Sequence, residues 1–160
     1  MDVSGDELAG VVDLFGALTR AELGQGLVEL AFKRGEEIDA DAFADDVDAA
    51  LRSYHLVAVE EADHDLAVSS AVLLAGPVAF PELPEGAADL PHIMDVSERD
   101  VDRTTAATAA AAAFRADAAT AVDSDDRERV TALLDVSYEL EAWGPVDLAD
   151  ARERLDDALG

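Results

Sequence analysis

Acidic side chains are so abundant in this chain that any compact fold it adopts must accommodate the repulsion between them. Asp and Glu number 37 against 11 Lys and Arg, Lys33 is the only lysine, and the formal net charge is −26. Like charges at this density destabilise a compact state unless ions screen them. At about 1 M salt the Debye length is about 3 Å, compared with about 8 Å at physiological salt. The charge therefore predicts a protein adapted to a salty cell interior.

Salt adaptation explains the acidic composition better than disorder or binding to a basic partner does. A disordered acidic tail lacks apolar residues, and a protein that binds a basic partner concentrates its acids in blocks. Here half of the residues are hydrophobic, and the acids are interspersed with Val, Leu and Ala. An ordinary protein made soluble by acidic residues stays open as the alternative to salt adaptation.

Length and composition predict a soluble cytoplasmic protein. A chain of 160 residues suits one domain, or two small ones that share a core. No run of about 18 apolar residues could cross a membrane, and residues 1–7 lack the basic segment of a signal peptide. Cysteine is absent, which excludes disulfides, thiolate metal sites and cysteine nucleophiles.

Hydrophobic spacing in the first part of the chain predicts three helices and then a small hairpin. The helices are expected at 5–18, 20–34 and 41–53, a strand at 55–60 and a possible return strand within 66–74. Thr19 and Glu22 form a capping-box signature for the second helix, and Gly35 suits its C-terminal end. Asp39 or Asp41 is expected to cap the third helix.

This order of elements resembles a winged-helix module. The resemblance covers roughly residues 5–75 and rests on the order and length of the elements rather than on a specific motif. It implies a winged-helix-like module over residues 1–75. A generic helical bundle with a short hairpin stays open as the alternative.

The chain changes character after residue 75. Four of the five prolines lie within 76–96, where they prevent regular structure, but the apolar residues between them indicate an extended strap on the core rather than a linker. Residues 97–160 predict a helical C-terminal segment with helices at 98–121, 125–142 and 147–158. Ser97 or Asp100 is expected to cap the first of these, which is rich in alanine.

Together these features predict a fold that is mainly α with a small β-hairpin. The winged-helix-like module (1–75), the strap (76–96) and the three C-terminal helices (97–160) are expected to share one core.

No pattern in the chain points to catalysis, a cofactor, a metal or a small-molecule ligand. His55, His64 and His92 lie in three separate contexts, and none belongs to a paired metal-binding motif. With 37 carboxylates, any single pair of acids is uninformative. Gly24 and Gly26 lie within a helical pattern, without the lysine of a phosphate-binding loop, and indicate a close helix contact or a kink. The sequence therefore predicts a protein that is not an enzyme.

DNA binding is disfavoured, although winged-helix modules often place their third helix in the major groove. That helix carries Asp45, Asp46 and Asp48 with only Arg52 to offset them, so it would repel phosphates. Residues 1–60 contain fourteen acids against four cations, which are Arg20, Lys33, Arg34 and Arg52. A DNA-associated transcriptional regulator that uses these four cations is the alternative function.

The chain as a whole resembles the small uncharacterised protein families of haloarchaea. The resemblance rests on the acidic cysteine-free composition, the strap Gly76-Pro77-Val78-Ala79-Phe80-Pro81-Glu82-Leu83-Pro84 and the stretch Tyr138-Glu139-Leu140-Glu141-Ala142-Trp143. It implies no known activity. By fold analogy we predict a non-catalytic protein-interaction or adaptor module, whose partner is another protein or a second copy of itself. Phe80, Tyr138 and Trp143 are candidate contact residues if they prove exposed, although large aromatic residues are more often buried.

Overall fold

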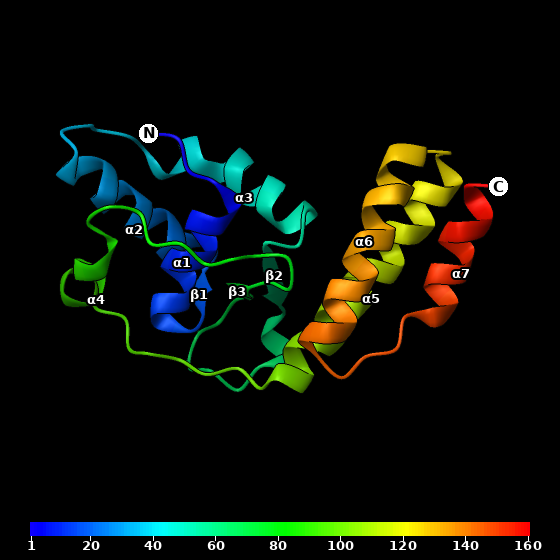
Figure 1. The fold of residues 1–160 in the computed structure, drawn as a ribbon. Helices are drawn as coiled ribbons and strands as arrows, with labels where there is room; N and C mark the ends of the chain where they lie inside the picture. The colour runs from blue at the N-terminus through cyan, green and yellow to red at the C-terminus, as the bar shows by residue number, and fades with distance from the viewer. The chain divides into compact units, whose positions relative to one another are not determined.

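The computed structural model describes residues 1–160 as seven α-helices and one three-stranded antiparallel sheet (Figure 1). The prediction of a mainly α protein with a small β-hairpin is confirmed. The chain divides into two compact units, Met1–Val101 and Asp102–Gly160. Residues 76–96 belong to the first unit.

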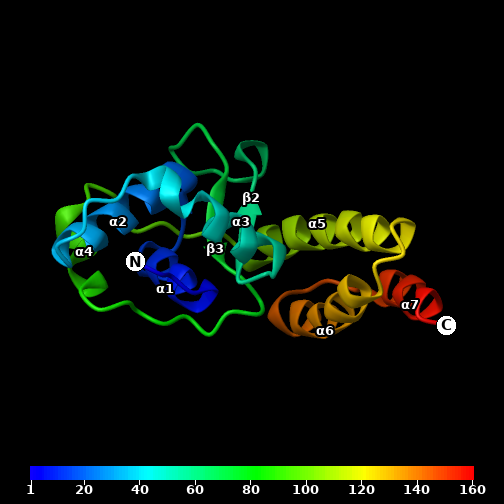
Figure 2. The ribbon, with the colours of Figure 1, turned by 90° about the horizontal axis from the view of Figure 1, so that it is seen from above.

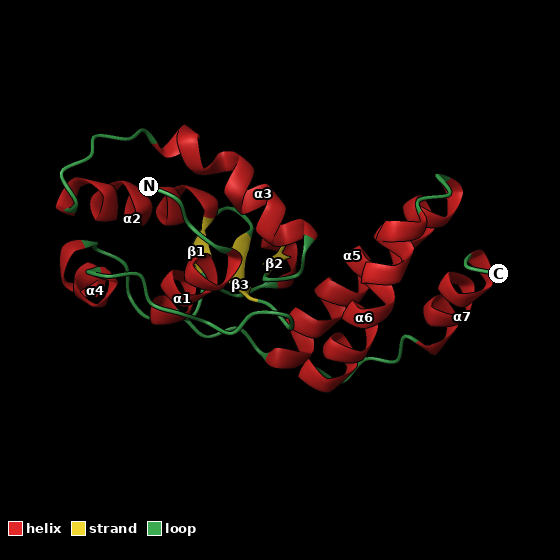
Figure 3. Ribbon diagram, turned by 45° about the horizontal axis from the view of Figure 1, so that its top comes forward, coloured by secondary structure: helices red, strands yellow, loops and turns green.

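The N-terminal unit is built from helices that surround a short sheet (Figure 3). In chain order its elements are α1 (Gly5–Phe15), β1 (Leu18–Thr19), α2 (Arg20–Lys33), the 3-10 helix η1 (Ala40–Phe43), α3 (Ala44–Arg52), β2 (Leu56–Val59), η2 (Glu61–Asp63), β3 (Val72–Ala75), η3 (Ala87–Asp89) and α4 (Leu90–Ile93). The strand order is β1-β3-β2, so β3 pairs with both of the others.

Both long helices of this unit begin with the caps that their sequences favour. The Ser4 hydroxyl accepts a hydrogen bond from the backbone N–H of Glu7, whose carboxylate accepts from the N–H of Ser4. Thr19 and Glu22 form the same reciprocal box at the start of α2, as predicted. Gly35 follows the end of α2 with φ 79°, and the two bonds of a Schellman motif close the helix.

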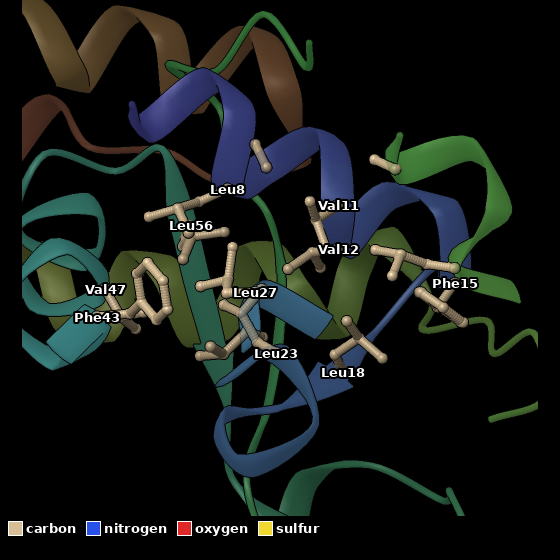
Figure 4. Close-up of a cluster of buried hydrophobic side chains, with 14 of the residues drawn as sticks. Leu8, Val11, Val12, Phe15, Leu18, Leu23, Leu27, Phe43, Val47 and Leu56 are labelled. Carbon is tan, nitrogen blue, oxygen red and sulfur yellow. The ribbon is translucent and has the colours of Figure 1, made fainter. Parts of the chain in front are cut away.

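The core of the N-terminal unit lies between α1, α2, α3 and the sheet (Figure 4). One face of α1 is fully buried because its apolar residues recur at helical spacing. The labelled core residues come from all four parts of the unit: Leu8, Val11, Val12, Phe15, Leu18, Leu23, Leu27, Phe43, Val47 and Leu56. Gly24 and Gly26 prove to be close contacts, because Gly24 faces Ala40 and Gly26 faces Met94.

Three details of the N-terminal unit differ from the sequence prediction. The third helix has no side-chain cap, because Asp39 precedes η1 without a capping bond and α3 then begins at Ala44. The two-residue strand β1 was not predicted, since two residues carry no detectable periodicity. The strap is not free of regular structure, because η3 and α4 form within it, with Pro91 in the first turn of α4, where its missing N–H costs nothing.

The segment that follows the strap is fixed by an ion pair between Arg99 and α2. The guanidinium of Arg99 donates to both carboxylate oxygens of Glu22, at 2.5 and 2.9 Å, and its backbone N–H donates to the carbonyl of Phe15 at 2.7 Å. Both side chains of the pair are mostly buried. The bond from Arg99 holds the pKa of Glu22 below its ordinary value, against the opposing effect of burial.

Replacing Arg99 with glutamine is expected to lower the free energy of unfolding by about 2 kcal/mol at neutral pH. Because the folded pKa of Glu22 is lowered, this stabilisation is complete above the unfolded pKa, about 4.3, and is lost as the pH falls through the folded value. Urea unfolding in molar KCl from neutral to acidic pH measures it. Arg20→Gln breaks the exposed pair with Asp48 and is the control, with an expected loss of about 0–1 kcal/mol. An Arg99→Gln deficit that persists undiminished at low pH would contradict the assignment.

The C-terminal unit consists of three helices, α5 (Arg103–Asp123), α6 (Arg127–Trp143) and α7 (Ala149–Ala158) (Figure 2). Six alanines of α5 are buried, namely Ala106, Ala107, Ala110, Ala111, Ala118 and Ala121, and the larger anchor of the helix is the buried Phe114. Gly144 lies so close to the methyl group of Ala107 that a Cβ there would overlap it. The buried alanines therefore serve contacts within this unit.

The predicted cap of the first C-terminal helix is wrong. Neither Ser97 nor Asp100 caps α5, because Arg99 is bound to Glu22 and the helix begins only after Asp102. The difference arises because a long-range ion pair outweighs a local capping preference.

Candidate functional site

The histidines are not brought together. His55 Nδ1 lies 2.7 Å from the hydroxyl of Ser53, and its Nε2 lies 3.6 Å from a carboxylate oxygen of Asp6. His64 lies in the loop between β2 and β3 and bonds the backbone of that loop, as expected for a polar turn, while His92 is exposed on α4. No group of three or more His, Asp and Glu side chains is placed to hold a metal ion.

Three of the four cations proposed for DNA binding are bound within their own unit. Arg20 donates to Asp48 at 2.6 Å, Lys33 donates to Asp89 at 3.2 Å, and Arg34 donates to the carbonyl of Glu85 at 3.3 Å. Arg52 is exposed at the end of α3. Arg20 and Lys33 stand at opposite ends of α2, roughly 20 Å apart along the helix axis, so the four cations do not form one cluster.

The third helix presents carboxylates to solvent. Asp45 and Asp48 are exposed on α3, and Asp41 is exposed on the preceding η1. Asp45 and Asp46 lie in the first turn of α3, where the helix dipole favours negative charge. The acids therefore stabilise the helix itself, but they would repel the phosphates of a nucleic acid.

The strap carries the most exposed large apolar side chain of the protein. Phe80 is 82% exposed, and Leu83, three residues further, is 48% exposed. We call these two residues the strap site. The sequence prediction that the apolar residues of the strap lie on the core holds for Leu90 and Met94, which are buried, but is wrong for Phe80, Leu83 and Ile93, which are exposed.

The backbone beneath the strap site is held by α1. The N–H of Phe80 donates to a carboxylate oxygen of Asp6 and the N–H of Glu82 donates to the carbonyl of Asp6, both at 2.9 Å. Gly10 lets the strap approach, because a Cβ there would overlap the carbonyl oxygen of Glu82. The site thus presents apolar side chains from an ordered backbone, which lowers the entropy lost when a partner binds.

Two further apolar side chains of the N-terminal unit are exposed. Phe32, in the last turn of α2, is 66% exposed, and Ile93 on α4 is also exposed. Lys33 and Arg34 tie this end of α2 to residues 85–89 of the strap. The N-terminal unit therefore combines exposed apolar groups with cations that are already paired.

The C-terminal unit contains a groove of about 570 Å³ between α5 and α7. Its lining consists of four alanines, one valine and five charged residues of both signs: Arg115, Ala118, Ala119, Val122 and Asp123 from α5, and Asp150, Ala151, Arg154, Asp157 and Ala158 from α7. Arg115 donates to the carbonyl of Asp147 at 3.1 Å. No periodicity argument indicated this groove, because it arises from the way α7 packs on α5.

The other two aromatic candidates are covered by arginines of their own unit. The guanidinium of Arg152 lies 4.4 Å from the ring centroid of Tyr138, and that of Arg103 lies 4.2 Å from the ring of Trp143. Tyr138 nevertheless remains 60% exposed and Trp143 is half-buried. Arg152 also donates to Glu141 at 2.8 Å, and this bond lowers the pKa of that carboxylate.

Comparison with known proteins adds a family but no activity. A family model described as a family of unknown function, DUF7109, matches residues 6–160. No curated protein and no solved structure matches the chain. None of its helices is both long enough and apolar enough to span a membrane.

Proposed function

We propose a function for this chain from its own surfaces, because it belongs to the DUF7109 family, whose function is unknown. The protein is a non-catalytic interaction or adaptor module of a halophilic archaeon, and the strap site on its N-terminal unit contacts a protein partner in the cytoplasm.

The observation that carries this proposal is the exposure of Phe80 on an ordered backbone. A phenylalanine ring that is 82% exposed gains stabilisation when a partner covers it, since burying such a side chain is worth about 1.5–3 kcal/mol. The hydrogen bonds to Asp6 hold this part of the strap in place before binding. Apolar residues held in this way are typical of protein contact sites.

The charge distribution favours a protein over DNA as the partner. Nucleic-acid affinity depends on cations that neutralise phosphates and release counterions, and this release contributes little in concentrated salt. Arg20, Lys33 and Arg34 already bond groups of the same unit. Covering the strap site, by contrast, requires no cation.

A winged-helix-like N-terminal unit is part of the proposal. The element order from α1 to β3 and the strand order β1-β3-β2 support it. In such a module the acidic α3 is the helix that would otherwise enter a DNA groove. We therefore propose a module of this type whose interaction surface is the strap instead of the third helix.

We also propose that the protein is not an enzyme, because its reactive side chains lie apart from one another. A general base needs a partner within hydrogen-bond reach of a shared substrate position. His55, His64 and His92 lie on different elements, and the α5–α7 groove has no histidine in its lining.

The double variant Phe80→Ser/Leu83→Ser is expected to lose the protein partner that the wild-type chain retains from a lysate of its own organism in molar KCl. The reason is loss of apolar area at the contact, worth several kcal/mol for two large side chains. Affinity capture with quantitative mass spectrometry measures the ratio of bound partner. Tyr138→Ser removes another exposed ring from the other unit and should leave capture unchanged.

Two results would contradict the proposal. One is equal capture by the double variant and the wild type. The other is that the protein binds a mixed-sequence DNA duplex, that Arg52→Glu weakens this binding, and that Phe80→Ser/Leu83→Ser does not change it. That result would favour the alternative function, a DNA-associated regulator.

A further inference from the structure

The groove between α5 and α7 carries charges of both signs. Its lining contains two arginines and three aspartates, a net charge of −1 over ten residues. Residues 103–122 of α5 include a single acid, Asp117, and that acid is paired with Arg129. A surface that carries both signs can form ion pairs with a second surface on which the same charges run in the opposite order.

The charges of the groove are arranged symmetrically along α5. Arg115, Ala119 and Asp123 are spaced four residues apart, so they lie along one side of the helix, and all three line the groove. The arginine and the aspartate stand about 6 Å to either side of Ala119 along the axis. On α7, Arg154 likewise has Asp150 one turn before it and Asp157 one turn after it.

We propose that this groove is the contact surface of a homodimer, with a two-fold axis close to Ala119. Such an axis lays α5 of one copy antiparallel across α5 of the other. It places Arg115 of each copy opposite Asp123 of the second copy, which makes two equivalent ion pairs. An isologous contact requires this kind of self-complementary pattern: if residue i of one copy meets residue j of the second, then residue j of the first copy meets residue i of the second.

The lining side chains permit the close approach that this arrangement needs. Ala118, Ala119 and Ala151 offer only methyl groups between the charged residues, so two helices can pack at short separation. A partner with a uniformly basic surface would instead meet Arg115 and Arg154 with like charge.

This inference goes beyond the proposed function, since it concerns the other unit and assigns a second copy of the chain as the occupant. The strap site and the groove share no residue. Failure of one assignment therefore leaves the other intact.

Analytical ultracentrifugation of the full chain in molar KCl is the test. The wild type is expected to sediment as a dimer at micromolar to submillimolar concentration. Ala119→Glu places a bulky carboxylate on the axis and is expected to weaken association on the order of tenfold to a hundredfold. Ala132→Glu makes the same change on the exposed side of α6, outside the groove, and should leave the dimer unchanged.

Charge reversal tests the pairing directly. Arg115→Asp and Asp123→Arg should each weaken the dimer, and the double variant should restore it, because it exchanges the two signs across the axis. Circular dichroism verifies that each variant is folded. A monomeric wild type, a dimer that Ala119→Glu leaves intact, or a double variant no better than the singles would overturn the proposal. Partner capture through Phe80 and Leu83 should be the same in Ala119→Glu and the wild type, which separates this result from the proposed function.

Discussion

Replacing Gly16 with alanine is expected to destabilise the N-terminal unit by about 3–5 kcal/mol. Gly16 ends α1 with φ 83° and ψ −46°, a conformation that a residue with a Cβ rarely adopts. In addition, a Cβ at this position would overlap the carbonyl oxygen of Arg99, which is backbone and cannot rotate away. The substitution therefore combines conformational strain with a clash that pushes the backbone around Arg99 away from α1.

Gly35→Ala is the matched control for this prediction. Gly35 also has a positive φ, 79°, but nothing lies within 4 Å of a Cβ built there. Gly35→Ala should therefore lower the free energy of unfolding only by the cost of the backbone conformation, about 1–2 kcal/mol. Urea unfolding in molar KCl measures both variants, and equal losses at the two glycines would contradict the assigned clash.

A second measurement separates local strain from displacement of the backbone around Arg99. If that backbone moves in Gly16→Ala, the ion pair between Arg99 and Glu22 weakens, and Arg99→Gln should then lower the free energy of unfolding by less than it does in the wild type. A double-mutant cycle gives this coupling energy. Full additivity of the two substitutions would show that the ion pair is unaffected.

Transfer from molar KCl to millimolar buffer at neutral pH is expected to lower the free energy of unfolding by on the order of 5 kcal/mol. This amount is comparable with the whole stability of a small domain. Without screening, the excess of 26 negative charges repels across both units. Helicity and melting temperature should both fall. Circular dichroism at a series of KCl concentrations measures the effect, and curves that are superimposable from low to high salt would contradict the predicted adaptation to salt.

Local sequence signals accounted for most of the helices. The predicted helices at 20–34 and 125–142 agree with α2 and α6 to within two residues at each end, because apolar periodicity and end signals such as Thr19, Glu22 and Gly35 act over a few residues. The predicted start at residue 98 was five residues early for α5. Arg99 forms its bonds with Glu22 and Phe15, far away in the chain, and no local pattern reveals that.

The candidate sites were only partly accessible to sequence reasoning. Phe80 was identified as a candidate contact residue, but its exposure depends on how the bonds to Asp6 orient the strap. The four cations proposed for DNA binding could be counted in the sequence, whereas the bonds that three of them make with Asp48, Asp89 and the carbonyls of the strap could not be predicted. The α5–α7 groove was missed entirely, since it combines residues from two helices.

The sequence by itself determined the helical composition of both units, the small hairpin and the density of negative charge, because propensity, periodicity and charge are properties of neighbouring residues. Only the tertiary structure decided which cations are already paired, which apolar side chains of the strap remain exposed and where two helices leave a groove. Those outcomes depend on contacts between residues tens of positions apart, such as Asp6 with Phe80 and Arg20 with Asp48. Their geometry exists only once the chain has packed.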